Sequence, residues 1–254
     1  MKGGLHLITK TLEKLSRKNA DAFGHVPATI GFLGDSVTNG CFEVLSAMTE
    51  QGESGFDVVF EPESGYPAEF RRLLAMLYPK AQINIINAGI SGDNAPGGLA
   101  RMERDLLPYH PDLTVVCYGL NDCGRGVDGI PVYHDALVSV IRRLQEAGSE
   151  VILMTPQPVC TRVHTQLRGE GLRAIAAQLT DLFSDGTFDR YMQAARLAAE
   201  ETGTPLCDVY AKWMAMHENG VDITDHLSNY LNHPSRRMHQ MAAWMLLDTL
   251  FIGK

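Results

Sequence analysis

The chain has 254 residues and no long apolar run. A membrane-spanning helix needs roughly 18 or more consecutive apolar residues, and no segment of the sequence reaches that length. The first ten residues, MKGGLHLITK, are interrupted by polar residues every few positions and contain no apolar core of signal-peptide length. We therefore expect a cytoplasmic protein with no membrane partner.

Paired cysteine motifs and an excess of positive charge are also missing. None of the five cysteines forms a C-x-x-C motif, so the sequence indicates neither a zinc site nor a dithiol redox site. The formal net charge is −8, which argues against nucleic acid as the main partner because nucleic acids attract basic surfaces. We expect no nucleic-acid partner and no metal.

Several familiar motifs of α/β proteins are absent. Gly31 and Gly34 lie at the end of an apolar run, but this run lacks the Lys-Ser/Thr of a P-loop and is not G-x-G-x-x-G. The G-x-S-x-G elbow of α/β hydrolases also fails, because Thr38 stands where its second glycine belongs. The sequence therefore indicates no phosphate-bearing cofactor, and we expect no cofactor at all.

What the sequence does contain is a regular alternation of short apolar runs and longer amphipathic segments. An apolar content of 45% and a charged content of 20% are ordinary for a globular protein. The alternation is typical of an α/β fold, a parallel sheet flanked by helices. We expect strands near residues 29–33, 83–87, 113–118, 151–155 and 205–209, and helices near residues 9–18, 67–77, 98–107, 132–147, 190–202 and 235–250.

Two segments, residues 41–65 and 156–187, break this alternation. Both contain several glycines and prolines, and both are expected to be insertions over one end of the sheet. Loops of such length in compact domains are often lids or binding loops. No linker-like boundary divides the chain, so residues 1–254 are predicted to form a single domain.

Polar or glycine-rich loops follow the first three predicted strands. They have the sequences GDS at residues 34–36, NAGISGDN at residues 87–94 and GLND at residues 119–122. The carboxyl ends of parallel strands meet at one edge of a sheet, where α/β proteins bind ligands. Gly-Asp-Ser alone is also common in ordinary turns. The prediction of a site therefore depends on the combination, which includes His233 before the last helix.

The residue types in these loops suit acyl transfer, which needs a nucleophile, a base and donors for an oxyanion. Ser36 is the candidate nucleophile and His233 the candidate base. The candidate oxyanion donors are the backbone N–H groups of Ser36 and Gly92 and the side-chain amide of Asn121. Glycine lets a substrate approach the backbone closely, and an asparagine amide donates without a net charge.

The remaining polar residues near these loops are expected to have structural roles. Asp35 is expected to hydrogen-bond within its turn, because adjacent residues of an extended segment point apart. Asp122 is expected to secure the Asn121 loop, and Asp93 the loop that contains Gly92. His239 is expected to pack in the fold or to lie on the surface, on a different helix face from His233.

Together the loops resemble the blocks of the SGNH (GDSL-type) hydrolase superfamily, whose namesake residues are Ser, Gly, Asn and His. Residues 34–36 are similar to its first block, Gly92 to the second, and residues 119–122 to the third, G-x-N-D. His233-Pro234 is similar to the histidine of the last block. The resemblance covers nearly the whole chain. It implies a flavodoxin-like three-layer α/β/α sandwich that hydrolyses esters or thioesters without a metal.

The sequence departs from the family pattern at one position. The last block is usually D-x-x-H, but Tyr230 stands three residues before His233. The acid of a triad orients the imidazole, fixes its tautomer and stabilises the imidazolium. Three explanations stay open. A backbone carbonyl near residue 230 accepts the Nδ1 proton and leaves a Ser–His dyad, Asp225 or Asp222 reaches back, or strong catalysis has been lost.

The predicted function is that of a metal-independent serine esterase that forms an acyl-enzyme with a small-molecule ester. The family includes lipases, lysophospholipases, thioesterases and carbohydrate O-acetylesterases. An Asn-His-Pro ending without the aspartate is similar to the carbohydrate-esterase members, so we expect a small acyl group, acetyl, on a sugar or similar polar alcohol. The alternatives are a short-chain acyl esterase or thioesterase of lysophospholipase type, acyl transfer to another alcohol, and a non-catalytic binding module on the same fold.

Overall fold

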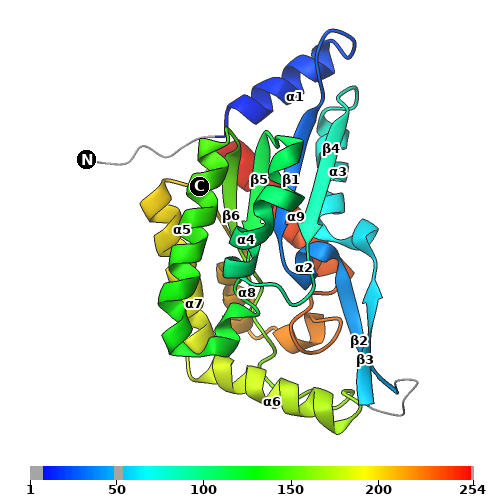
Figure 1. Cartoon of the computed structure of the whole chain (residues 1–254). Coiled ribbons are helices and arrows are strands. Elements are labelled where there is room, and N and C mark those ends of the chain that lie inside the picture. Colours follow the sequence, from blue (N-terminus) through cyan, green and yellow to red (C-terminus); the bar gives the residue numbers. More distant parts are fainter. Residues whose placement is uncertain (1–7, 49–53, 253–254) are drawn as a thin grey trace.

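A computed structural model describes residues 8–48 and 54–252 and shows a five-stranded parallel sheet (Figure 1). The strands lie in the order β4-β1-β5-β6-β7, so that β1 is flanked by β4 and β5. All five strands expected from the sequence are confirmed. Their bounds are β1 Ala28–Gly34, β4 Ile83–Gly89, β5 Leu113–Cys117, β6 Glu150–Thr155 and β7 Leu206–Asp208.

The central strands are continuous apolar runs because helices cover both of their faces. Every residue of β5 is buried, whereas β4 at the edge of the sheet has several half-buried or exposed residues. The parallel register places Gly34, the last residue of β1, opposite Gly89 of β4 and Cys117 of β5. The three strands therefore end level with one another, and the loops that follow them begin side by side.

Helices form a layer on each side of the sheet. In Figure 1, α4 and α5 cross in front of the sheet and α9 passes behind it; α5 packs against α4 and α7, and α3 against α9. This arrangement confirms the three-layer α/β/α sandwich. The helices are α1 Lys10–Ala20, α2 Ser36–Asn39, α3 Tyr66–Leu77, α4 Ala95–Asp105, α5 Ile130–Glu146, α6 Glu170–Ser184, α7 Thr187–Thr202, α8 Val209–Glu218 and α9 Arg236–Ile252.

Both segments that break the alternation contain regular structure. Residues 41–65 include an antiparallel hairpin of β2 Cys41–Met48 and β3 Ser54–Phe60, with residues 49–53 outside the described ranges. Residues 156–187 include α6, and Figure 1 shows one end of α6 beside this hairpin. A Cβ on Gly171 would lie 3.6 Å from the ring of Phe56, so the two insertions touch.

Three helices, α2, α6 and α8, were not predicted from the sequence. Gly169 and Gly186 are the N-cap residues of α6 and α7. These glycines made residues 156–187 resemble a loop in the sequence. α8 begins at Val209, directly after β7, because Asp208 caps it by accepting a hydrogen bond from the N–H of Ala211 over 3.1 Å. Among the described residues no helix is long and apolar enough to cross a membrane.

Candidate active site

Ser36 is the first residue of α2, a single helical turn that follows β1 after one residue. Asp35 caps this turn, because its Oδ1 accepts a hydrogen bond from the N–H of Val37 over 2.9 Å. The preceding Gly34 has no room for a side chain, since a Cβ there would lie 2.8 Å from the carbonyl oxygen of Cys117. This close packing holds Ser36, which is 5% exposed, at the carboxyl edge of the sheet.

His233 lies against Ser36, although 197 positions separate the two residues in the sequence. The Ser36 Oγ and the His233 Nε2 are 3.0 Å apart. The other ring nitrogen, Nδ1, is 2.8 Å from the carbonyl oxygen of Phe42 in β2. The structure thus brings together the serine and the histidine that the sequence singled out.

The Phe42 carbonyl fixes the protonation pattern of the imidazole. A carbonyl oxygen can only accept, so Nδ1 of His233 must carry the proton and donate it. Nε2 of the neutral ring then presents its lone pair to the Ser36 hydroxyl. This tautomer is the one in which an imidazole accepts a proton from a serine.

The carbonyl that orients His233 does not belong to the region of residue 230, where the sequence led us to expect it. It belongs to Phe42, in the hairpin inserted after β1. The proposed reach of Asp222 or Asp225 is also wrong, because both carboxylates bind elsewhere. The Arg162 guanidinium donates to each of them over 2.7 Å, and Nδ1 of His233 is bonded to Phe42 instead.

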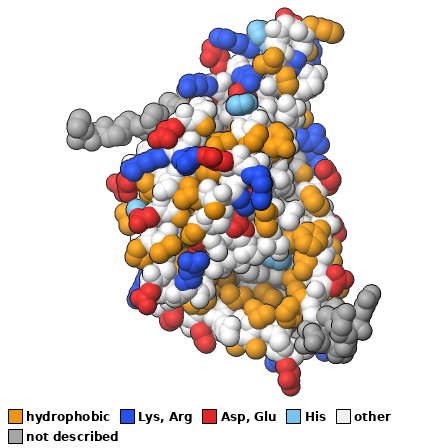
Figure 2. Space-filling model, viewed as in Figure 1, with side chains coloured by type: hydrophobic (Ala, Val, Ile, Leu, Met, Phe, Trp, Pro, Cys, Tyr) orange, Lys and Arg blue, Asp and Glu red, His pale blue; other side chains and the backbone are white. Residues whose placement is uncertain are grey.

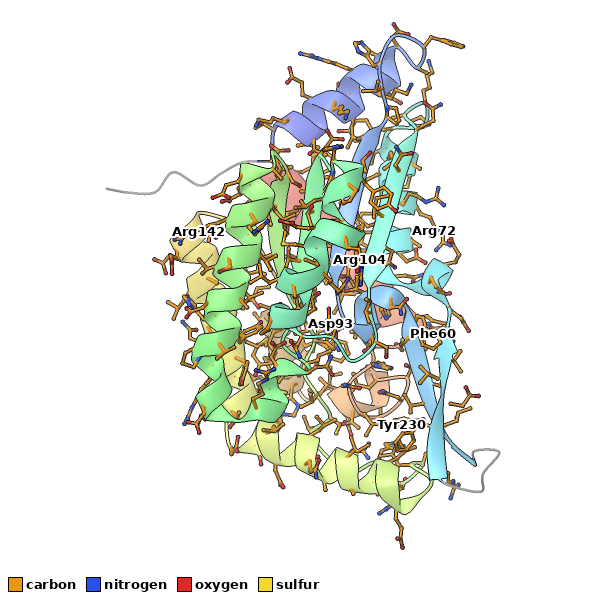
Figure 3. The ribbon with its side chains drawn as sticks, in the orientation of Figure 1. Phe60, Arg72, Asp93, Arg104, Arg142 and Tyr230 are labelled. Carbon is orange, nitrogen blue, oxygen red and sulfur yellow. The ribbon has the colours of Figure 1, made fainter. Side chains whose placement is uncertain are left out.

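Tyr230, at the position of the family's aspartate, makes its side-chain contacts with the segment before α6. Its hydroxyl donates to Oε1 of Gln166 over 2.7 Å, and its ring stacks on that of His164 with centroids 4.0 Å apart. In Figure 3 it lies toward α6. Tyr230 has a φ of +55°, a left-handed conformation that is rare outside glycine. The side chain in this place therefore anchors a loop, and it carries no charge for His233.

Asn229 holds the histidine loop from within. Its Oδ1 accepts hydrogen bonds from the N–H groups of residues 231, 232 and 233 over 2.9–3.0 Å. Such an asparagine turn fixes the backbone from which the His233 side chain projects. Asn229 was not singled out from the sequence, where its signal is an asparagine just before a short polar loop.

The second and third loops are joined by Asn121. Its Nδ2 donates to the carbonyl oxygen of Asp93 over 2.7 Å, which leaves the second amide hydrogen of the same group for another acceptor. Gly92 has a φ of +80°, and a Cβ there would meet nothing within 4 Å. The positive φ explains the glycine at this place, and the open space beside it leaves the backbone accessible.

Arg101 in α4 links the three loops and was not singled out from the sequence. Its side chain is 9% exposed. It donates to Oδ2 of Asp93 over 2.6 Å, to the carbonyl of Gly34 over 3.0 Å and to the hydroxyl of Tyr118 over 2.9 Å. The Tyr118 hydroxyl in turn donates to Asp93 over 3.0 Å. Asp93 therefore does secure its loop, by pairing with the buried Arg101. In the sequence, the one sign of this pair is that a cation follows Asp93 by eight residues.

Burial shifts the pKa of several groups in this region. It raises the pKa of Asp35 to about 7 and that of Asp122 to about 6. Asp122 Oδ1 accepts from the N–H of Ala95 over 3.0 Å, so it joins the third loop to the start of α4. Burial lowers the pKa of His233, although its bond to Phe42 acts in the opposite direction. The imidazole is therefore neutral, and able to accept a proton, at neutral pH.

The residues expected to be structural lie in the core. His239 is buried and on its Nδ1 accepts the N–H of Tyr66 over 3.0 Å, so it packs in the fold. The five cysteines, Cys41, Cys117, Cys123, Cys160 and Cys207, are free and buried. Across residues 8–48 and 54–252 there is no group of three or more His, Cys, Asp or Glu side chains that could hold a metal ion.

A parallel three-layer sandwich with these blocks at its carboxyl edge defines the class of SGNH-type hydrolases. Residues 32–241 match the GDSL-like lipase/acylhydrolase family. An acetylxylan esterase from Geobacillus stearothermophilus is 26% identical over 189 residues, which cover 71% of this chain and 75% of the relative. An arylesterase from Vibrio mimicus is 30% identical over 121 residues, or 44% and 59% of the two chains.

Solved structures show the same fold. Axe2, an acetylxylan esterase from Geobacillus stearothermophilus, superposes with a TM-score of 0.59 at 23% identity, covering 88% of this chain and 94% of its own. An α/β hydrolase enzyme from the metagenome of Lake Arreo gives a TM-score of 0.61 at 22% identity, covering 89% and 96%. Because the family match spans most of the sequence, the chain belongs to the GDSL-like lipase/acylhydrolase family and is a carboxylic ester hydrolase.

Proposed function

We propose that the protein is a serine esterase that works through an acyl-enzyme with a Ser36–His233 dyad. The Ser36 Oγ attacks the ester carbonyl carbon while its proton passes to Nε2 of His233. The tetrahedral intermediate collapses when His233 returns the proton to the leaving alcohol. A water molecule then attacks the acyl-enzyme, gives its proton to His233, and releases the acid and the free serine.

The observation that carries this proposal is the 3.0 Å contact between the Ser36 Oγ and the His233 Nε2. A general base must be within hydrogen-bond reach of the proton that it removes, and its pKa must leave it unprotonated at the working pH. Phe42 sets the tautomer and burial keeps the ring neutral. Both conditions therefore favour His233 as the base.

For the oxyanion we propose three donors, the backbone N–H groups of Ser36 and Gly92 and the free amide hydrogen of Asn121. Donors that are fixed before the reaction stabilise developing charge most effectively. The bond from Asn121 to the Asp93 carbonyl fixes the amide, and the Arg101 contacts fix the loop that contains Gly92. These roles are supported by the position of the three loops, which all begin side by side at the same edge of the sheet.

As substrate we propose an acetyl ester of a carbohydrate or a similar polar alcohol. The relative that covers most of this chain is an acetylxylan esterase, and its name describes an enzyme for acetylated sugar polymers. A second candidate is a short-chain or aromatic ester, since another relative is an arylesterase. Hydrophobic side chains gather around a hollow between α6 and the β2–β3 hairpin (Figure 2), and such a lining suits an apolar acyl or aromatic group.

The experiment that tests the dyad compares wild type, Ser36→Ala and Ser91→Ala with p-nitrophenyl acetate and a fluorophosphonate probe. Ser91 is an exposed serine of the neighbouring loop and serves as the matched control. We expect hydrolysis and labelling in wild type and Ser91→Ala, and loss of both in Ser36→Ala. Activity of Ser36→Ala equal to that of wild type would refute the dyad.

The substrate class needs a separate comparison. Release of acetate from acetylated xylo-oligosaccharides is measured beside hydrolysis of p-nitrophenyl acetate, butyrate and octanoate. A higher kcat/KM for the sugar acetates supports the carbohydrate proposal. A kcat/KM that rises with acyl length, together with inert sugar acetates, supports the second candidate instead.

A further inference from the structure

The β2–β3 hairpin contains a β-bulge at the point where it meets His233. Cys41 pairs with Phe60, but the next pair is Val44 with Val58. Two residues of β2, Phe42 and Glu43, therefore stand opposite a single residue of β3. Such a bulge bends its strand and turns local groups in a new direction. The carbonyl that accepts the Nδ1 proton of His233 belongs to this bulge.

The ring of Phe42 is held by two side chains of α9. It is fully buried, with the Arg236 guanidinium 4.3 Å from its centroid and the His239 ring 4.9 Å away. A guanidinium over an aromatic face is attracted by the electron density of the ring. α9 begins three residues after His233, so one short segment supplies both the imidazole and the groups that hold its acceptor.

Arg236 also ties both strands of the hairpin to the start of α9. Its Nη1 and Nη2 donate to the two carboxylate oxygens of Glu43 over 2.7 and 3.1 Å. Its Nε and Nη2 donate to Glu61 over 2.8 and 2.6 Å. Glu43 lies in the bulge, whereas Glu61 directly follows β3. Planar, two-pronged pairs of this kind fix orientation as well as distance.

We propose that Arg236, Glu43 and Glu61, here called the bulge clamp, position the Phe42 carbonyl so that it takes the place of the missing triad acid. The inference rests on the proposed Ser36–His233 dyad and deepens it. A triad acid holds the imidazole in one tautomer and orientation. Here a main-chain oxygen does so, and a cation fixed by two carboxylates keeps that oxygen in place.

The clamp also affects the charge around His233. Its two carboxylates and one guanidinium leave a net charge of −1 beside the dyad. Burial lowers the pKa of His233, while the Phe42 bond and then the Glu43 charge raise it. Further titratable groups in this region are Asp35, which precedes Ser36, Cys41, which precedes Phe42, and His239, whose pKa burial lowers to about 3. Glu43 thus favours the imidazolium that forms when Ser36 attacks.

The clamp lies in a half-exposed part of the fold. The side chains of Arg236, Glu43 and Glu61 are 39%, 34% and 41% exposed. Ion pairs at such positions contribute modestly to stability, and the two-pronged geometry around Arg236 places this group at the upper end of that range. Variants of the clamp are therefore expected to fold, and their effects should be seen in the dyad.

The first test measures the kinetics of Arg236→Gln, Arg236→Lys, Glu43→Gln and Glu61→Gln on p-nitrophenyl acetate, normalised to fluorophosphonate-labelled sites. We expect Arg236→Gln to lower kcat by about 10-fold or more while KM changes by less than about 2-fold, because orientation of the base matters mainly in the transition state. Arg236→Lys keeps the charge without the fork and should recover part of this loss.

The two glutamate variants form a matched pair, since each removes one carboxylate from the same arginine. Glu43→Gln should lower kcat more than Glu61→Gln does, because only Glu43 belongs to the bulge. It should also move the acidic limb of kcat/KM to lower pH, because the charge that raises the pKa of His233 is removed. Equal effects of the two variants, or an unshifted limb in Glu43→Gln, would contradict the assignment.

A second measurement does not depend on activity. Nitrogen NMR of histidine-labelled protein, assigned with His233→Gln, should show Nδ1 protonated in wild type and a mixture of tautomers in Arg236→Gln. An Arg236→Gln protein that keeps wild-type kcat and the Nδ1–H signal overturns the inference while leaving the dyad intact. A wild-type protein no more active than Ser36→Ala overturns the dyad, and the tautomer comparison still decides the clamp.

Discussion

We expect the wild-type protein to lose stability as the pH rises, because the buried carboxyl of Asp35 must then ionise. The substitution Asp35→Asn should abolish this loss. Burial raises the pKa of Asp35 from 3.8 to about 7, and the charges of Asp122 and Asp93 add to this effect. Asparagine keeps an oxygen that can accept the N–H of Val37, the bond that caps α2. The substitution therefore changes the charge with little change in shape.

The sign and size of the effect follow from proton binding. Between pH 3.8 and about 7 the unfolded chain is ionised at Asp35 while the folded protein keeps the proton. The folded state then binds more protons, so its stability falls as pH rises. A pKa change of this size corresponds to roughly 4 kcal/mol, fully present below the unfolded pKa and lost by the folded one.

The assay is urea unfolding of wild type and Asp35→Asn at several pH values from about 4.5 to 7.5. The quantity of interest is the difference between the two proteins, because His233 and His239 impose the opposite slope. Burial lowers the pKa of both histidines, so their contribution to stability is lost as pH falls. Asp185→Asn is the matched control. Asp185 also accepts the N–H two residues ahead, over 2.7 Å, but it is exposed and its pKa is lowered.

We expect Asp35→Asn to gain stability relative to wild type as pH rises, while Asp185→Asn does not. A difference between wild type and Asp35→Asn that stays flat across the range would falsify this expectation. In that case Asp35 ionises like an exposed carboxyl, and burial does not control its proton.

Three further results are expected. Asn121→Ala should lower kcat on p-nitrophenyl acetate by ~100- to 1,000-fold, as loss of one oxyanion donor does; an unchanged kcat would remove Asn121 from that role. The acidic limb of the kcat/KM profile should lie below pH 6.5, because burial lowers the pKa of His233 from that value, and a limb above it would contradict this account. Arg101→Met leaves the carboxylate of Asp93, which is 12% exposed, without its cation, and should lower the free energy of unfolding in urea titrations by about 3–5 kcal/mol. The control Arg104→Met breaks an exposed ion pair and should change that free energy by less than about 1 kcal/mol.

The sheet was predictable from the sequence because its strands are covered on both faces and therefore read as short apolar runs. The β2–β3 hairpin could not be predicted, because its apolar residues Leu45 and Phe56 project into solvent rather than into a core. Its two strands pair with each other, within one irregular segment. Whether such a segment forms strands depends more on tertiary contacts than on the local pattern. α8 escaped notice because it follows β7 without a connecting loop.

At the candidate site, the sequence singled out the serine and the histidine that the structure brings together, but not the group that orients the histidine. Ser36 and His233 could be proposed as nucleophile and base because few residue types suit these roles. Every residue has a carbonyl, so no letter of the sequence marks that of Phe42. Asp222 and Asp225 could be considered as partners of His233 because the sequence does not show that Arg162, about 60 positions earlier, binds both of them.

An acceptor made of main chain differs from a carboxylate in how it responds to mutation. A single substitution at the family's usual acidic position deletes a side-chain acceptor outright. No substitution at residue 42 deletes its carbonyl, because every amino acid carries one. Substitution at residue 42 can therefore weaken the packing of the ring against Arg236 and His239, but it cannot remove the acceptor itself. An insertion or deletion in β2 would move that acceptor away from His233, so we expect changes in strand length to disturb the site most.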